Sequence, residues 1–358
     1  MLFTDILIIG GGPAGLCAAL QASKYHVRVT ILERYHQLGG QLVKQTHRFF
    51  GSKDEGAGDR GIHIAQLLQN KVNHNKMIDV RTNAVVLGIY DDHTITFEEN
   101  GIYEKIIADS MIIATGASEK MLPFEGNDLP GVFGAGAAQT LMNLYGVKPA
   151  EKVLMVGAGN IGLIVTYQML QAGVEVVAII DAADHIGGYM VHASKVRRLG
   201  VPIYMRTTIK EAIGKNYVEK AIIHNLDDHF NSISGTEQEL GVDAVCLAVG
   251  LTPLTELLRH LECKMKFIHM LGGFVPIHDK YMETTVQNVF VAGDASGVEE
   301  ASSAMLEGCI AGLSAVISLG YGNNTTVNDR DINIGNLAEL RNGDVGLKIR
   351  IGIKQLSM

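Results

Sequence analysis

The 358-residue chain is poor in cysteine, and the spacing of its cysteines excludes several kinds of site. Its four cysteines, Cys17, Cys246, Cys263 and Cys309, form no C-x-x-C pair and no metal-ligand pattern. The 13 histidines likewise show no H-x-x-E-H or H-x-x-x-H arrangement, so we expect no metal site. Isolated cysteines of this kind are typical of a reduced, cytoplasmic protein, and we expect that location.

Long runs of one residue class are also missing. There is no long basic run and the formal net charge is −8, which argues against a nucleic-acid partner. The apolar stretches are too short or too interrupted for a membrane span, and residues 1–5 lead into a strand without a cleavable leader. Hydrophobic residues make up 47% and charged residues 19%, the balance of a globular protein large enough for two domains.

Two glycine-rich fingerprints stand out among the residues that are present. Each follows an apolar, strand-like run and precedes a helix-compatible run. They read Gly10-Gly11-Gly12-Pro13-Ala14-Gly15 and Gly157-Ala158-Gly159-Asn160-Ile161-Gly162. In a G-x-G-x-x-G turn the first glycine permits the tight turn, the second admits a pyrophosphate, and the third lets helix pack on strand. The pyrophosphate then lies at a helix N-terminus, which favours negative charge. Two such turns predict two dinucleotide sites.

A carboxylate follows each fingerprint at the end of a second strand-like run. Glu33 ends the first of these runs and Asp181 the second, each about 20 residues beyond its glycines. Such a carboxylate can accept hydrogen bonds from the adenosine ribose and repels a 2′-phosphate. One acid alone could simply face water, but its repetition favours the ribose role. Because Ala182 and Ala183, rather than an arginine, follow Asp181, the second site favours NAD over NADP.

Three more segments complete an ordered set. Strand-like runs break into small-residue turns at Ala114-Thr115-Gly116 and around Gly250, and Gly293-Asp294 follows a further run. Each turn alone could be an ordinary strand end. Together with the fingerprints, their order resembles that of the two-dinucleotide-binding flavoprotein disulfide reductase superfamily.

The resemblance implies an α/β fold with two Rossmann-like domains, similar to glutathione and thioredoxin reductases. An NAD-binding domain over residues 118–253 would be inserted into an FAD-binding domain formed by 1–117 and 254–322, with a tail over 323–358. Asp294 would hydrogen-bond the FAD ribityl chain. A helix starting near residues 299–301 would point its N-terminus at the flavin pyrimidine and stabilise the reduced, anionic flavin.

Both cofactor sites can then be stated as residue sets. The expected FAD site comprises Gly10, Gly12, Pro13, Ala14, Gly15, Glu33, Arg34, Gly40, Gln41, Ala114, Thr115, Gly116, Gly293, Asp294, Glu300, Ala301 and Ser302. The expected NAD(H) site comprises Gly157, Gly159, Asn160, Ile161, Gly162, Asp181 and Gly250.

The redox cysteines of that superfamily are absent from this sequence. Lipoamide- and glutathione-reductase-like enzymes carry two cysteines just after a Gly-Gly pair, where this chain has Leu42 and His47. Thioredoxin reductases carry C-x-x-C ahead of the NAD fingerprint, and residues 131–138 contain none. A disulfide relay needs a thiolate beside the flavin, so we expect no disulfide reduction.

Polar residues follow the Gly39-Gly40 pair instead. Lys44, Gln45 and His47 are flavin-adjacent candidates that could line the flavin N1–C2=O edge or a route to a partner. The alternative is a solvated loop. No nucleophile is needed, because hydride transfer uses the cofactors' own reactivity and the protein supplies position and electrostatics.

Longer motifs narrow the resemblance. Residues 39–53, 130–140, 186–192, 271–276 and 297–302 resemble the sarcosine oxidase alpha-subunit-like flavoproteins of clostridia and their relatives. That group includes alpha subunits of heteromeric sarcosine, opine, proline and hydroxyproline dehydrogenases and of hydrogen cyanide synthase. In such assemblies an amine-oxidase-type partner subunit oxidises the C–N bond, and the alpha subunit carries electrons through its own FAD.

The resemblance therefore predicts an FAD-dependent NAD(H) oxidoreductase that serves as the electron-transferring subunit of an amine or imino-acid dehydrogenase. Two alternatives remain at this stage. One is a stand-alone NADH oxidase or NADH:acceptor reductase, and the other is a redox-responsive binding module.

The tail beyond residue 322 has a different composition. Residues 323–329 look like a polar linker, residues 332–340 could form a short helix, and residues 347–353 alternate apolar with polar residues or glycine. An apolar segment beyond a complete fold suggests docking on another chain. Folding back onto its own surface is the alternative.

Overall fold

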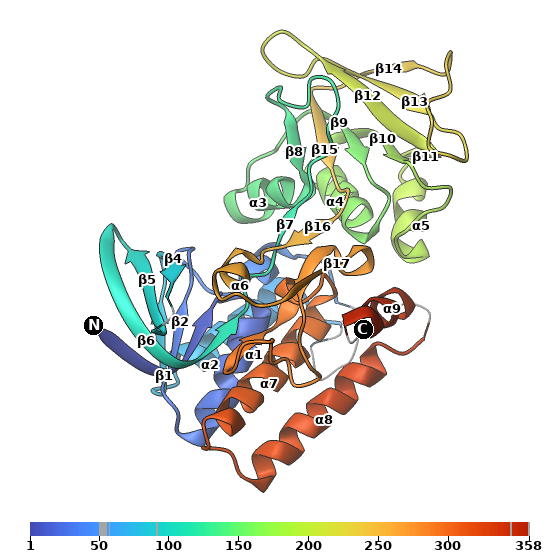
Figure 1. Ribbon diagram of the computed structural model, residues 1–358. Coiled ribbons are helices and arrows are strands. Elements are labelled where there is room, and N and C mark those ends of the chain that lie inside the picture. Colours follow the sequence, from blue (N-terminus) through green and yellow to red (C-terminus); the bar gives the residue numbers. More distant parts are fainter. Residues whose placement is uncertain (50–55, 57, 91, 344–345, 357–358) are drawn as a thin grey trace. The chain divides into compact units, whose positions relative to one another are not determined.

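The structure, a computed structural model, describes residues 1–49, 56, 58–90, 92–343 and 346–356 (Figure 1). Residues 50–53, the end of one quoted motif, lie outside the described residues. The chain divides into two compact units. Unit 1 comprises Met1–Ser118 and Thr252–Met358, and unit 2 comprises Glu119–Leu251. These borders lie within two residues of the expected domain limits.

Unit 1 is built on a sheet in the order β3-β2-β1-β6-β5-β4, with β19 also paired to β6. β1, β2, β3, β6 and β19 are parallel, and β4 and β5 are antiparallel additions. Their bounds are β1 (Leu2–Ile9), β2 (Val29–Leu32), β3 (Ile78–Arg81), β4 (Ala84–Ile89), β5 (Thr94–Glu99), β6 (Ile102–Ile113) and β19 (Val289–Val291). Because both faces of a parallel sheet are covered, the second half of β1 is apolar, and Ile6, Leu7 and Ile8 are fully buried.

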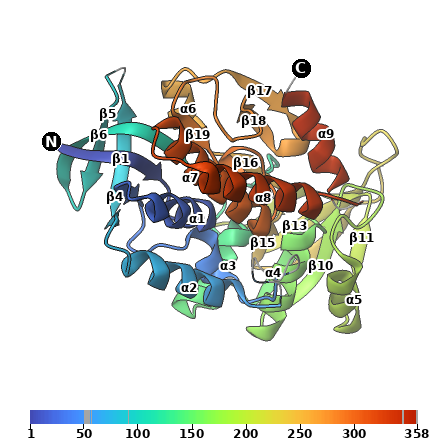
Figure 2. The same cartoon turned by 90° about the horizontal axis from the view of Figure 1, so that it is seen from below.

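The helices of unit 1 pack in layers on this sheet. They are α1 (Pro13–Ala22), α2 (Gly61–Asn73), α6 (Glu256–His260), α7 (Ala301–Ser318), α8 (Asn324–Leu340) and α9 (Leu347–Leu356). Figure 2 shows α7 between α1 and α8. A β-carbon on Gly308 or Gly312 would overlap the backbone of Ala14 or Ala18, so α7 crosses α1 at backbone contact.

Helix α7 is also apolar. Among the described residues it has the length and apolarity to cross a membrane, and 72% of it is buried inside unit 1. The core helix of a water-soluble protein meets the same two criteria. Its packing against α1 and the sheet accounts for that composition here.

Shorter elements complete unit 1. These are η1 (Ser23–Tyr25), η2 (Gly40–Lys44), η3 (His269–Leu271), η4 (Gly293–Ala295) and the paired strands β17 (Met265–Ile268) and β18 (Gly273–Pro276). The chain passes between the units at β7 (Ala117–Glu119) and β16 (Leu251–Pro253), which pair with each other. Beside them, Thr115 Oγ1 donates a 2.7 Å hydrogen bond to the Leu254 carbonyl.

The polar stretch at residues 323–329 is not a linker, contrary to expectation. Asn323 is the N-cap of α8: its side chain accepts from the Thr325 and Thr326 backbone, and Thr326 Oγ1 accepts from the Asn323 N–H. This capping box satisfies N–H groups that a helix start leaves unpaired. The helix therefore begins at Asn324 and is longer than predicted.

The alternating segment at residues 347–353 is also helical, because it belongs to α9. Gly352 and Leu356, one helical turn apart, are buried. A β-carbon on Gly352 would lie 2.8 Å from the Leu271 side chain, so α9 packs closely on its own unit. The described part of the tail thus folds back on unit 1.

Unit 2 has its own parallel sheet, in the order β11-β10-β9-β15-β8. Its strands are β8 (Val132–Gly134), β9 (Lys152–Val156), β10 (Glu175–Asp181), β11 (Ile203–Met205) and β15 (Ala244–Leu247). Other elements are α3 (Ala135–Tyr145), α4 (Asn160–Gln171), α5 (Met190–Arg198), and a small antiparallel sheet of β12 (Thr207–Ile213), β13 (Lys220–Asn225) and β14 (Gln238–Gly241).

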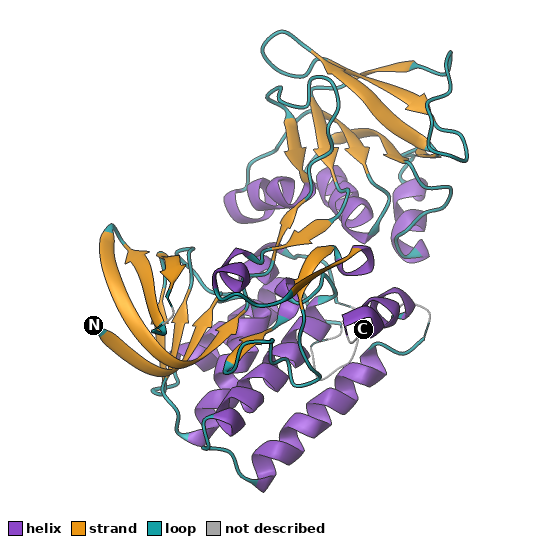
Figure 3. Ribbon diagram, viewed as in Figure 1, coloured by secondary structure: helices purple, strands orange, loops and turns teal. Residues whose placement is uncertain are grey.

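The side chains of successive residues in β9 lie on opposite faces of the parallel sheet. Val153 and Met155 join the helices in one core, while Leu154 and Val156 join the antiparallel sheet in another. Figure 3 shows both helices and strands in each unit. The expected α/β class with two Rossmann-like units is confirmed.

Candidate functional site

The first fingerprint forms a tight turn between β1 and α1. Gly10 has a φ of +111°, and a β-carbon there would overlap the Ala114 carbonyl. A β-carbon on Gly15 would overlap the Gly10 carbonyl, so the third glycine lets α1 pack on the turn. Gly12, the N-cap of α1, instead borders free space, with the Gly40 Cα nearest at 3.9 Å from a β-carbon. The α1 N-terminus therefore has open space beside Gly12, bordered by the backbone of Gly40.

Glu33 is locked beside this turn. Its Oε2 accepts a 2.7 Å hydrogen bond from the Gly11 N–H, and its Oε1 accepts a 2.8 Å bond from the Tyr35 N–H. The Gly39 N–H donates to the Gly11 carbonyl at 2.7 Å, so the Gly39-Gly40 loop closes over the fingerprint. A carboxylate oxygen can accept further bonds, so Glu33 keeps capacity for a ribose diol.

The Gly293-Asp294 turn lies against the first turn of α1. A β-carbon on Gly293 would be 3.0 Å from the Ala14 β-carbon. The Gly293 N–H donates to Glu307 Oε2 at 2.9 Å, and Ser296 Oγ donates to the same oxygen at 2.9 Å. Within the described part of the chain, Asp294 makes one long contact, in which Oδ1 accepts from the Glu299 N–H at 3.4 Å. Its carboxyl group thus retains capacity for a ligand.

Burial raises the pKa of Asp294 to about 7, with a smaller contribution from the neighbouring carboxylates of Glu307 and Glu299 and against the bond from the Glu299 N–H. Such a side chain can donate as well as accept near neutral pH. Both abilities suit a hydroxyl-bearing ligand such as a ribityl chain.

The three flavin-adjacent candidates are half-buried: Lys44 is the last residue of η2, and Gln45 and His47 follow it. Leu42 and Phe49, on either side of them, share one apolar cluster with Met305 of α7, and Ala301 packs against that cluster. The segment therefore lies beside the first turn of α7. Gln45 Oε1 is buried with no hydrogen-bond partner among the described residues, and His47 stacks on Phe49 with ring centroids 5.5 Å apart.

Some residues of the expected FAD site lie on the surface of unit 1. Arg34, Gln41 and Glu300 are exposed, and the Arg34 guanidinium lies 5.0 Å from the centre of the Tyr35 ring. Glu300 is the N-cap of α7 without a side-chain cap bond, whereas Ser302 is buried. Helix α7 begins at Ala301, where the sequence placed it.

The second fingerprint repeats the first within unit 2. Gly157 has a φ of +114°, and its β-carbon would overlap the Ala248 carbonyl. Asp181 Oδ2 accepts from the Ala158 N–H at 2.7 Å, and its Oδ1 accepts from the Ala183 N–H at 2.9 Å. The Gly188 N–H donates to the Ala158 carbonyl at 3.1 Å.

The rest of that turn is open. A β-carbon on Gly159 would have nothing within 4 Å, and Ile161 is 39% exposed. Asn160 Oδ1 accepts a 2.7 Å bond from the Tyr189 N–H. Gly250 has a φ of +114°, and its carbonyl accepts from the Lys120 N–H at 3.0 Å.

Both turns thus offer what a dinucleotide requires: a glycine cradle at a helix N-terminus and a fixed carboxylate at the end of the second strand. Burial raises the pKa of the Cys246 and Cys263 thiols, which disfavours the thiolate form. Among the described residues, no group of three or more His, Cys, Asp or Glu side chains could hold a metal ion.

Sequence reasoning missed the residues that brace these turns. Gly39 and Gly188 close over the two fingerprints, and Glu307 anchors the Gly293-Asp294 turn. A signal for Glu307 was present, because it is a lone carboxylate in an otherwise apolar helix and such a charge must be paired.

Two strand–turn–helix units with these features define an oxidoreductase of the two-dinucleotide type. The chain belongs to the pyridine nucleotide-disulphide oxidoreductase family, whose model matches residues 4–308. It is therefore a flavin-dependent oxidoreductase whose cofactors are FAD and a pyridine nucleotide.

Relatives confirm the resemblance to sarcosine oxidase alpha-type subunits. One of the opine oxidase subunits of Rhizobium meliloti is 28% identical over 91% of this chain and 65% of its own length. The alpha subunit of sarcosine oxidase from Corynebacterium sp. (strain P-1) is 25% identical over 89% of this chain, which spans 33% of that protein. The L-proline dehydrogenase structure from P. horikoshii shares the fold, with a TM-score of 0.72 and 24% identity over 94% of this chain and 59% of its own. The chain thus spans two thirds or less of each of these relatives.

Proposed function

We propose that this chain is the electron-transferring, alpha-type subunit of a heteromeric dehydrogenase that acts on an amine or imino acid. The substrate class is that of sarcosine, proline, hydroxyproline or an opine. The observation that carries the proposal is a complete pair of dinucleotide turns without the flavin-side thiols of disulfide reductases. Leu42, 1% exposed, and His47 stand at those two positions, so electrons must pass to or from a different acceptor.

In this proposal unit 1 holds FAD. The α1 N-terminus beyond Gly12 would bind the pyrophosphate, Glu33 the adenosine ribose, and Asp294 the ribityl chain. Bound FAD supplies the two-electron chemistry. The residues of the chain bind and orient it, and the N-terminus of α7 provides a positive end beside which negative charge is stabilised.

Unit 2 would hold NAD(H). Its open turn at Gly159 suits a nucleotide that exchanges at each turnover, and the Asp181 carboxylate disfavours a 2′-phosphate. A partner subunit of the amine-oxidase type would carry the C–N oxidation. Opine oxidase, hydrogen cyanide synthase and sarcosine oxidase relatives are all named as subunits, which supports an assembly of this kind, and we place it in the cytoplasm.

The experiment measures the flavin absorbance of the purified chain without oxygen, first with NADH and then with each candidate amine, alone and with an amine-oxidase-type subunit. We expect a yellow protein that NADH bleaches and that amines bleach only with the partner present. Amine oxidation by the chain alone would contradict the proposal. Rapid NADH turnover with oxygen or dyes, and no gain from any partner, would favour the stand-alone NADH oxidase or NADH:acceptor reductase.

A further inference from the structure

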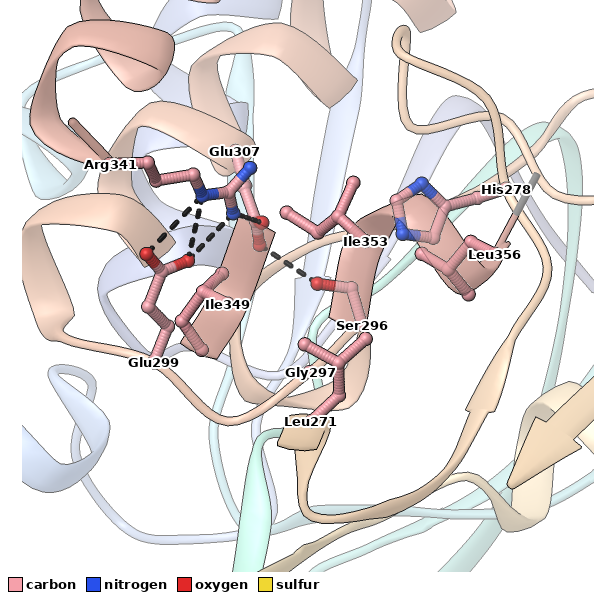
Figure 4. Close-up of a pocket in the computed structure, with 10 residues that line it drawn as sticks. All are labelled: Leu271, His278, Ser296, Gly297, Glu299, Glu307, Arg341, Ile349, Ile353 and Leu356. Atoms are coloured by element: carbon pink, nitrogen blue, oxygen red, sulfur yellow. Dashed lines mark hydrogen bonds and ion pairs between the residues drawn. The ribbon is translucent and has the colours of Figure 1, made fainter. Parts of the chain in front are cut away.

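A buried group of charges joins the C-terminal tail to the Gly293-Asp294 turn. Arg341, the C-cap residue of α8, extends its guanidinium between Glu299 and Glu307 (Figure 4). Its Nη2 lies 2.7 Å from Glu299 Oε2 and 2.5 Å from Glu307 Oε1, and its Nε donates to Glu299 Oε2 at 3.0 Å. The side chains are 13%, 14% and 6% exposed respectively, so this ion pair network is protected from solvent.

The network continues from Glu307 to the turn itself. While Oε1 of Glu307 receives Arg341, its Oε2 accepts from both the Gly293 N–H and Ser296 Oγ. Asp294 is the next residue, and its one described hydrogen bond comes from the backbone of Glu299, the second carboxylate that Arg341 binds. Arg341 is thus linked to the turn in two ways, through the Glu307 side chain to Gly293 and through Glu299 to Asp294.

Charge balance gives Arg341 a second effect. Three carboxyl groups, those of Asp294, Glu299 and Glu307, gather here, and burial raises the pKa of Glu299 even though Arg341 acts to lower it. Arg341 lines the small cavity at this place together with both glutamates. Removing one partner of a buried ion pair leaves an uncompensated charge, which costs far more than loss of a surface pair.

We propose that Arg341 is a positioning residue of the flavin site: through Glu307 it fixes the Gly293-Asp294 turn, and its charge offsets the carboxylates beside the flavin. The inference rests on the proposed binding of FAD by unit 1. It makes flavin retention depend on α8, a helix that lies beyond residue 308, where the family match ends.

The test compares four variants of the full chain: Arg341→Gln, Arg341→Lys, Glu299→Gln and Arg330→Gln. Arg330 is the matched control, because it also lies on α8, is 12% exposed and stacks on the Tyr281 ring at 3.8 Å instead of on the carboxylates. The measurements are the Kd for FAD, the flavin midpoint potential and the thermal unfolding temperature.

We expect Arg341→Gln to weaken FAD binding roughly ten-fold or more, because hydrogen bonds to charged groups are lost. It should also lower the midpoint potential, since a cation no longer opposes the negative charge of the reduced flavin. Glu299→Gln should raise the potential, Arg341→Lys should restore part of both properties, and Arg330→Gln should change neither.

Opposite shifts from Arg341→Gln and Glu299→Gln cannot arise from a loosened fold, which would move both variants in one direction. If Arg341→Gln does not fold, Glu299→Gln and Arg341→Lys still decide the matter. Unchanged FAD affinity and potential in these variants would overturn the inference while leaving the proposed function intact. A wild-type chain that binds no FAD would instead refute the proposed function.

Discussion

The two fingerprint turns are built from the same contacts but are braced differently. In each, a carboxylate accepts the N–H of the residue between the first two glycines, and a second glycine loop donates to the carbonyl of that residue. In unit 1 the following helix α1 also meets α7 backbone to backbone, at Gly308 and Gly312. In unit 2 helix α4 meets its neighbours through side chains, as in the 3.0 Å bond from Gln139 to Gln168.

If unit 1 binds FAD and unit 2 binds NAD(H), as proposed, we expect this difference to separate a retained cofactor from an exchanged one. The backbone contact with α7 leaves α1 little freedom to shift. The Gly293-Asp294 turn also packs against Ala14, in the first turn of α1. The second turn has no such cover at Gly159 within the described part of the chain. We therefore infer that the fingerprint sets the kind of ligand, and that the elements packed on its helix set how long the ligand stays.

The largest effects are expected from a side chain placed at the second glycine of each fingerprint, Gly12 or Gly159. Gly12 and Gly159 have φ angles of −77° and −74°, which any residue adopts, so valine at either place should fold. Gly12→Val should yield a colourless protein, because the side chain occupies the pyrophosphate position. Gly159→Val should stay yellow but lose bleaching by NADH. Absorbance spectra check both, and a yellow Gly12→Val protein would contradict the assignment of unit 1 to FAD.

The backbone contact between α1 and α7 gives the next largest effect. Gly308→Ala should lower the free energy of unfolding by about 1–3 kcal/mol, because the new methyl group overlaps Ala14. Flavin should be released more readily as well. Gly335→Ala on α8 is the control: nothing lies within 4 Å of its β-carbon, so it should stabilise by about 0.4–1 kcal/mol. Equal behaviour of the two variants in urea unfolding would show that the helices do not touch as described.

Nucleotide preference offers a sharper test of unit 2 alone. Wild-type protein should be bleached by NADH much faster than by NADPH, because two N–H groups hold the Asp181 carboxylate in place at the proposed ribose site, where it would repel a 2′-phosphate. Asp181→Ser combined with Ala182→Arg should narrow this preference by roughly ten-fold or more, equivalent to about 1.4 kcal/mol. Flavin content should not change. Equal wild-type rates with the two nucleotides would refute the role of Asp181.

The last expected effect concerns pH and unit 1. Asp294 titrates near 7 in the folded chain against 3.8 for an ordinary aspartate, so between these values the native state holds a proton that the unfolded state has lost. Stability of the FAD-free protein should therefore fall as pH rises from about 4 to 7, contrary to the usual carboxylate. Asp294→Asn should reduce this fall, leaving the part that the raised pKa of Glu299 causes, and its unfolding temperature should exceed that of wild type more at pH 8 than at pH 5. A wild-type curve that rises over this range would contradict the raised pKa.

Local geometry explains why both turns could be predicted from the sequence. Gly10 and Gly157 need positive φ angles, and Glu33 and Asp181 contact residues of their own strand–turn–helix unit, so short motifs carry the information. The contacts of Arg341 could not be predicted in this way, because Glu299 lies 42 positions away and no local pattern links them.

The tail shows a second reason for the limits of sequence reasoning. Residues 347–353 alternate in a strand-like manner, but a helix forms because Gly352 leaves room for Leu271 and Leu356 fills the next turn. Such a contact depends on a partner far along the chain. The capping residues Asn323 and Thr326 were visible in the sequence, but the polar composition around them led to the prediction of a linker.

The bond between Thr115 and Leu254 has a consequence for the ancestry of the chain. It brings the departure and return points of unit 2 together, and β7 and β16 pair just beyond it. A whole gene segment can enter at such a place without separating any neighbours in the host sheet. The same adjacency means that a short turn could replace residues 119–251 and leave unit 1 as a self-contained domain.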